Sequence, residues 1–176
     1  MGEVLNVNFQ GKQRVLDLLG QIQQRLGSPR GGLEIIGGAI KDSVDENFRV
    51  GGRPTPWAKS KRVKDEESRP GGEGQTLVSS GHLRDSFGIR VQGGSVFVGT
   101  NVPYAAIHDL GGTIKAHAIM PKNKKALKFM GRDGEVIRKK VMIPEIHMPQ
   151  RQFLMVQDED WDEINRQLID YLIKGA

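Results

Sequence analysis

Residues 87–99, with the sequence FGIRVQGGSVFVG, predict a β-hairpin. Apolar side chains alternate with polar ones on both sides of Gly93-Gly94, and this period of two is typical of strands that bury one face. A pair of glycines suits the tight turn between two antiparallel strands. The alternating residues are Phe87, Ile89 and Val91 before the turn and Val96 and Val98 after it. The rest of the chain must therefore supply a cover for the apolar face of this hairpin.

Two amphipathic helices are predicted before the hairpin. The first runs from Gln13 to Leu26 and the second from Pro29 or Leu33 to Phe48, because apolar residues recur every three or four positions in both. Gly37-Gly38 lies inside the second helix, where each glycine costs about 1 kcal/mol relative to alanine. We expect either a kink at this point or close packing against a neighbouring element.

Further strands and a last helix are predicted after the hairpin. The strands lie at 126–130 and 136–143, and an amphipathic helix follows over 161–174 with Asp160 as its N-cap. Helices, then strands, then a helix are typical of an α+β fold. We predict one domain over residues 1–176, in which an antiparallel sheet is packed by N-terminal and C-terminal amphipathic helices.

The segment from about residue 50 to residue 76 is predicted to be a long mobile loop. It contains three prolines and several glycines, with the charged run 59–69 between them. So little apolar surface cannot offset the entropy that ordering the chain costs. Trp57 is a large apolar side chain in this polar segment, so we expect it either to anchor a partner or to pack locally beneath the loop.

The composition excludes several kinds of chemistry. The chain has no cysteine, so disulfides, thiolate metal sites and a thiol nucleophile are excluded. The glycine pairs lack the spacing of a phosphate-binding loop, and the four histidines lack that of a helical metal site. His82 or His108 would serve a serine hydrolase only if it shared a cleft with a carboxylate. We predict no enzyme activity, no cofactor and no metal, and no apolar run long enough to cross a membrane.

The basic residues form two clusters beside predicted strands. The net charge of +5 favours an acidic partner, and nucleic acid is the obvious candidate. Clusters with few aromatic residues between them suit contact with DNA phosphates rather than reading of bases. Lysines that keep edge strands from aggregating are the alternative explanation. The clusters are Lys122, Lys124, Lys125 and Lys128, and then Arg138, Lys139 and Lys140.

Three short boxes occur in order along the chain. They are LVSSGHLRDS at 77–86, YAAIHDLGG at 104–112 and MPQRQFL at 148–154, the last just before the terminal helix. With Phe48 and the later Trp57, this order resembles the virion morphogenesis (tail completion) proteins of Mu-like phages. Asp109 departs from the pattern, since many relatives carry Gln there, and the segment around 119–129 looks more like related neck and minor tail proteins.

The resemblance implies a structural, non-enzymatic phage protein. It would act in tail completion or head–tail joining at the neck, and would form rings, hexameric on assembly. Its partners would be tail tube, neck or connector subunits, and its place the virion, reached from the host cytoplasm during assembly. The alternative is a stand-alone nucleic-acid-binding module that uses the lysine clusters.

The resemblance also suggests roles for single residues. Trp57, Arg84 and Arg151 are the candidates for a partner or subunit interface. The two arginines would either hold the boxes together through charged hydrogen bonds or reach a neighbouring subunit. The basic clusters, Lys122 to Lys128 and Arg138 to Lys140, would face DNA or a lumen through which DNA passes. Four apolar residues of the boxes are expected in the core: Tyr104, Ile107, Phe153 and Leu154.

Overall fold

The computed structural model describes residues 12–67, 74–131 and 134–175. Its helices are α1 (Lys12–Gly27), α2 (Arg30–Val50), α3 (Lys61–Glu67), α4 (Ala105–Leu110) and α5 (Asp158–Lys174), with a 3₁₀ turn at Arg84–Ser86. Its strands are β1 (Gly88–Gln92), β2 (Ser95–Gly99), β3 (Gly112–Ile114), β4 (His117–Ile119), β5 (Leu127–Gly131), β6 (Gly134–Arg138), β7 (Val141–Ile143) and β8 (Ile146–Met148). The predicted α+β class is confirmed.

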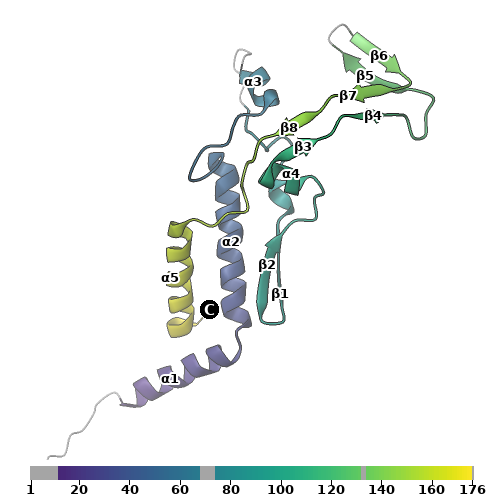
Figure 1. Cartoon of the computed structure of the whole chain (residues 1–176). Coiled ribbons are helices and arrows are strands. Elements are labelled where there is room, and N and C mark those ends of the chain that lie inside the picture. Colours follow the sequence, from purple (N-terminus) through teal and green to yellow (C-terminus); the bar gives the residue numbers. More distant parts are fainter. Residues whose placement is uncertain (1–11, 68–73, 132–133, 176) are drawn as a thin grey trace, which may run out of the picture.

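Helix α2 is the centre of the body, with α5 on one side and the β1–β2 hairpin on the other (Figure 1). The hairpin pairs as the sequence predicts, with Val91 opposite Val96 across the glycine turn. The chain leaves α2 at Gly51, whose left-handed backbone (φ 79°) suits glycine and allows its neighbour Gly52 to bond back to Asn47. The long second helix therefore supplies the cover that the hairpin needs.

The glycine pair in α2 marks a close approach, and the helix runs through it without a break. A methyl group built on Gly37 would lie 2.6 Å from Cγ2 of Ile89 and 2.7 Å from Cγ2 of Val96. On Gly38 it would meet nothing within 4 Å. Close packing against the hairpin is thus the reason for Gly37, and Gly38 has no such role.

The core lies where the C-terminal half of α2 meets the chain on its way to α5. The Phe153 ring stacks on the Phe48 ring with centroids 5.1 Å apart, and the Phe87 ring closes the group at 5.7 Å from Phe153. The predicted core position of Phe153 is confirmed, but Tyr104 and Leu154 are exposed. Leu154 follows Phe153 in an extended segment, where neighbouring side chains point to opposite sides.

The strands pair as separate two-stranded ribbons and not as the one sheet predicted from the sequence. The pairs after the first hairpin are nested: β3 with β8, β4 with β7, and β5 with β6, all antiparallel. The chain thus runs outward along β3, β4 and β5 and returns along β6, β7 and β8. We call residues 112–131 and 134–148 the arm, and Figure 1 shows that it projects away from the helices.

Helix α2 covers a strand pair as predicted, but the other two amphipathic helices, α1 and α5, do not. Helix α5 packs on α2, and α1 packs on α5, so neither is the direct cover of a strand pair. Figure 1 shows α1 lying across the C-terminal end of α5, at the far end of the molecule from the arm. None of the helices described has the length and apolarity needed to cross a membrane.

The predicted loop at 50–76 contains a short helix, α3, so the interpretation of this whole segment as irregular is wrong. Val63 is buried, and the guanidinium of Arg62 donates to the Gln75 carbonyl at 2.7 Å. The backbone N–H of Ser60 donates to Thr76 Oγ1 at 3.2 Å. The buried valine and these hydrogen bonds hold the segment in place. Its charged sequence alone does not predict this order. Part of the predicted loop, residues 68–73, lies outside the described residues, and the mobility of the loop stays a prediction.

The packing at Gly37 generates a stability prediction. Gly37→Ala should lower the free energy of unfolding by about 1–3 kcal/mol, because the new methyl forces Ile89 and Val96 out of place. Gly38→Ala, one residue away in open space, should raise it by up to about 1 kcal/mol through helix propensity. Urea unfolding followed by circular dichroism measures both. Equal effects of the two substitutions would contradict the close-packing explanation.

Candidate assembly interface

The arm carries the basic excess of the whole chain. The stretch 115–143, which includes most of the arm, contains nine basic and two acidic residues, so it has a net charge of +7 against +5 for the chain. The remainder of the chain is therefore slightly acidic, with a net charge of −2. The fold concentrates positive charge on one projecting part of the molecule.

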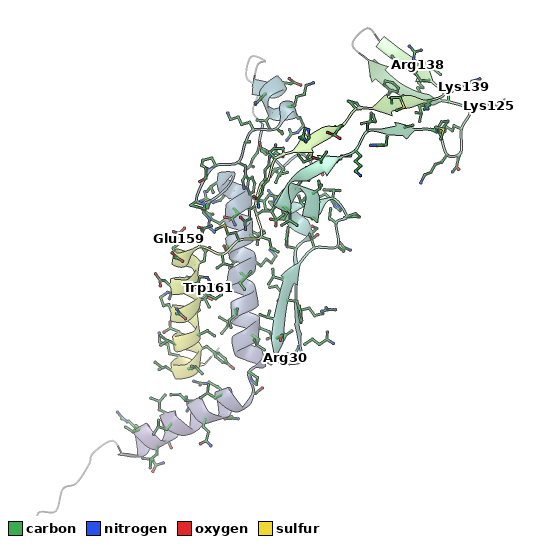
Figure 2. All side chains as sticks on the ribbon, in the orientation of Figure 1. Arg30, Lys125, Arg138, Lys139, Glu159 and Trp161 are labelled. Atoms are coloured by element: carbon green, nitrogen blue, oxygen red, sulfur yellow. The ribbon has the colours of Figure 1, made fainter. Side chains whose placement is uncertain are left out.

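The structure brings the two predicted lysine clusters together. Leu127 pairs with Arg138 across β5 and β6, so the segments just before β5 and just after β6 lie at the same end of that ribbon. Figure 2 shows Lys125, Arg138 and Lys139 close together on the arm. All seven cluster residues are exposed, and Lys128 forms an ion pair with Glu135 at 2.6 Å. A DNA-facing role of these residues stays a prediction; the structure places them in one region of the arm.

Large apolar side chains lie exposed on the same arm. Met130 has 79% of its surface exposed and Met120 has 64%, and the other arm residues of this kind are Ile119, Phe129, Ile137, Met142 and Ile146. A ribbon of two strands has no second layer to bury such residues and is marginally stable alone in water. Exposed apolar surface on this scale, bordered by charge, is typical of a protein–protein contact. The sequence predicts some of these strands but does not indicate their exposure.

Trp57 packs against the core of its own chain. Its ring meets Phe48 edge-on with centroids 5.5 Å apart, and Nε1 donates to the Gln152 carbonyl at 3.2 Å. Local packing is thus what the described chain shows, and the indole is only half-buried. The anchoring of a partner by Trp57 stays a prediction.

The two box arginines lie in different surroundings. Arg151 is buried, and its Nε donates to the Ala58 carbonyl at 2.9 Å, which ties the segment after α2 to the segment after the arm. Burial lowers the pKa of Arg151. Arg84 is at the surface and pairs with the adjacent Asp85 at 2.6 Å. An interface role for Arg151 would require its side chain to leave its internal hydrogen bond, whereas Arg84 is already at the surface; both roles stay predictions.

Asp109, the departure from the box pattern, has a clear structural use. Its Oδ1 accepts from the backbone N–H groups of Phe153 and Leu154, at 2.9 and 3.0 Å. On the other side, Asn47 Nδ2 donates to the carbonyls of Phe153 and Met155. One carboxylate and one amide thus satisfy an extended segment that has no strand neighbour. The role of Asn47 has no signal in the sequence, because nothing in the spacing indicates a partner more than a hundred residues away.

His82 and His108 line one cleft of about 470 Å³ together with His147 and several serines. The described residues lining this cleft include no Asp or Glu, which the serine hydrolase hypothesis required. Burial, and to a lesser degree the charge of Arg151, lowers the pKa of His108, which favours its neutral form. Among the described residues, no group of three His, Asp or Glu side chains has the geometry to hold a metal ion.

Asp160 joins α5 to α2 and to the segment that follows it. The Arg53 guanidinium lies 2.9 Å from Asp160 Oδ2, the Ser43 hydroxyl donates to the same oxygen, and the backbone N–H of Gln157 donates to it at 2.9 Å. Burial alone would raise the pKa of Asp160, but the hydrogen bonds from Ser43, Gln157 and Arg53 outweigh it and lower the pKa. The N-cap of α5 is Gln157, and not Asp160 as the sequence predicted; Asp160 instead completes the capping box from the third position of the helix.

The comparisons identify the class of protein. The model of the phage virion morphogenesis family matches residues 11–173, so this chain belongs to that family. This confirms the resemblance drawn from the boxes and supports a role in the assembly of phage particles. A relative from Haemophilus influenzae, the Mu-like prophage FluMu G protein 2, is 30% identical over 109 residues, which cover 62% of this chain and 72% of the relative. No solved structure matches the chain.

The Asp160 contacts predict a pH dependence. A carboxyl whose pKa is lowered on folding contributes stability above its unfolded pKa of about 3.9, and this is lost as the pH falls through the folded value. Asp160→Asn should therefore lower the free energy of unfolding by about 1–3 kcal/mol at pH 7. Between about pH 5 and pH 2 this variant should lose less stability than the wild type. Asp158→Asn, at an exposed position in the same first turn of α5, is the control. Urea unfolding across this pH range is the measurement, and matching pH profiles for the two variants would contradict the assignment.

Proposed function

We propose that this protein is a non-enzymatic structural part of the phage particle that acts in tail completion or head–tail joining at the neck. Its partners are other virion proteins: tail tube, neck or connector subunits. Membership of the virion morphogenesis family supports the assembly role. The observation that carries the proposal is the uncovered arm, where exposed apolar residues lie beside a concentration of positive charge.

The shape suits a ring of identical subunits. A compact body with one long arm presents different surfaces at its two ends, and contacts between unlike surfaces produce a ring when the rotation closes. The arm buries its apolar side chains only when another subunit covers them. We propose a closed ring, hexameric on assembly, in which Trp57 and Arg84 lie near the contacts between subunits or partners.

A second role concerns DNA. The net charge of +7 on residues 115–143 lies on a part of the molecule that projects from the body, where it can reach a large polyanion. Lysines with few aromatic neighbours contact phosphates without reading sequence. Within the ring, we propose that the arm lines the lumen through which DNA passes; as a stand-alone function, the same residues would make a nucleic-acid-binding module.

Deletion of the gene tests the assembly role. A phage without it should make heads and tails that fail to join, or tails of abnormal end or length, visible by negative-stain electron microscopy. The wild-type gene supplied in trans should restore infectious particles. A variant in which a short glycine turn replaces residues 115–143 should not, although circular dichroism shows its helices intact. Normal infectious particles from the deletion strain would refute the proposal.

Salt-dependent binding tests the role of the basic arm. Substitution of Lys122, Lys124, Lys125 and Lys128 by Ala should weaken binding to duplex DNA and reduce the slope of log K against log salt by about 0.9 for each phosphate that is no longer neutralised. A control variant removes four positive charges from helix surfaces: Arg30, Lys41, Arg166 and Lys174. Mobility-shift assays over a salt series give both slopes. No shift of wild-type protein at low salt, or equal weakening in the two variants, would remove the DNA role.

A further inference from the structure

Helix α1 carries an apolar stripe that the described residues of its own chain leave largely exposed. Val15 is 58% exposed, Leu19 is 56% exposed and Leu26 is 63% exposed, and Leu18 lies on the same side. Positions 15, 19, 22 and 26 recur every three or four residues and so share one face of the helix. Of these, only Ile22 is partly buried. A stripe of this kind is the usual core-facing side of a helix, but no core covers it here.

Among the described residues, α1 packs on α5 through its second half, where Ile22 and Arg25 are partly buried. Arg25, near the end of the helix, donates from its guanidinium to the Leu172 carbonyl of α5, and Figure 1 shows the rest of α1 extending past the end of α5. An isolated helix of 16 residues is marginal in water, because its stability in proteins comes mainly from packing of the apolar face. The described residues thus leave this stripe available for packing against a partner.

Helix α5 carries a second uncovered stripe. Ile164 on its inner side is buried, yet Trp161 is 47% exposed, Ile169 is 56% exposed and Ile173 is 46% exposed. These three residues follow a spacing of eight and four, which places them along one side of the helix; Trp161 is labelled on α5 in Figure 2. The molecule thus displays two apolar stripes, on helices of nearly equal length: 16 residues in α1 and 17 in α5.

The charges of the two helices are complementary. Helix α1 holds three basic residues and one acidic residue, a net charge of +2, and α5 holds six acidic and two basic residues, a net charge of −4. Two α1 helices packed on each other would bring like charges together, and so would two α5 helices, which costs free energy. A contact between α1 and α5 covers both stripes and also pairs opposite charges.

We propose that α1 of one copy packs along the exposed stripe of α5 in a neighbouring copy. The proposal rests on the ring of the proposed function and names one of its contacts. Because the two surfaces differ, each copy gives its α1 to one neighbour and receives α1 from the other, which is the head-to-tail arrangement that a closed ring requires. The short connection between α1 and α2 fixes where α1 leaves the body and so sets the direction of the next copy.

Engineered cysteines test this contact directly, because the full chain has no cysteine of its own. One batch carries a single cysteine at Val15, Leu19 or Leu26, and a second batch carries one at Trp161, Ile169 or Ile173. Each pair is mixed and oxidised over a range of protein concentrations. At least one pair should give a disulfide-linked dimer of one chain from each batch, identified by mass spectrometry. Gln24 is exposed on the opposite face of α1, so Gln24→Cys is the matched control. It should give about tenfold less of the mixed dimer.

A second measurement does not depend on a disulfide. Leu19→Glu places a charge in the stripe and should weaken self-association in analytical ultracentrifugation by about tenfold or more, whereas Gln24→Glu should leave it unchanged. Circular dichroism and urea unfolding establish that both variants keep the fold.

Three results would overturn the proposed contact. One is a full panel of mixtures without a mixed dimer, the second is crosslinking mainly between two α1 cysteines, and the third is a monomer at every concentration that binds anionic lipid vesicles through α1. The assembly role would survive each of them if the deletion strain still made unjoined heads and tails. Normal particles from that strain would instead remove the assembly role, whatever the cysteines show.

Discussion

The stacking of Phe153 on Phe48 holds the structure together where its parts meet. The segment that returns from the arm passes this point before it becomes α5, and it must lie in the interior without a strand beside it. Asp109 and Asn47 make this possible, because one accepts from its N–H groups and the other donates to its carbonyls. Loss of this aromatic contact would weaken the packing at the point where α2, the segment before α5 and the segment that carries Trp57 meet.

The elements that could be predicted from the sequence are those whose apolar residues recur at a regular spacing. The hairpin at 87–99, α2 and the terminal helix each pack one face against a neighbouring element, so their apolar residues recur regularly. The strands β3 and β8 were not predicted, since three residues are too few to show a period. Helix α3 was also missed: among residues 61–65 the buried side chain is Val63, and a single apolar residue shows no period. The contact of Arg53 with Asp160 has no local signal at all.

The candidate interface could be predicted only in part. Both lysine clusters were visible in the sequence, but their union at one end of a ribbon depends on the register of β5 and β6. The exposure of Met120, Met130 and Met142 was not visible, because apolar strands are normally expected to lie in a sheet with a cover. A protein that completes its packing only in an assembly breaks that expectation, so its sequence alone overstates the single chain's core.

Charge is divided unevenly between the arm and the rest of the molecule, whereas exposed apolar residues occur on both. The arm is basic and the body slightly acidic, with uncovered apolar residues on the arm, on α1 and on α5. Membership of a virion morphogenesis family gives this division a context, since subunits of a particle must recognise one another with a fixed polarity. Opposite charges on the arm and on the rest of the chain favour unlike contacts over like ones.

The nested pairing of the arm has an evolutionary consequence. The arm leaves the body along β3 and returns along β8, and these two strands are hydrogen-bonded to each other. Residues added or removed in matched pairs beyond this point would lengthen or shorten the ribbon without moving either end at the body. The length of the arm can therefore change between related proteins, to contact partners of different diameter, while the helices stay the same.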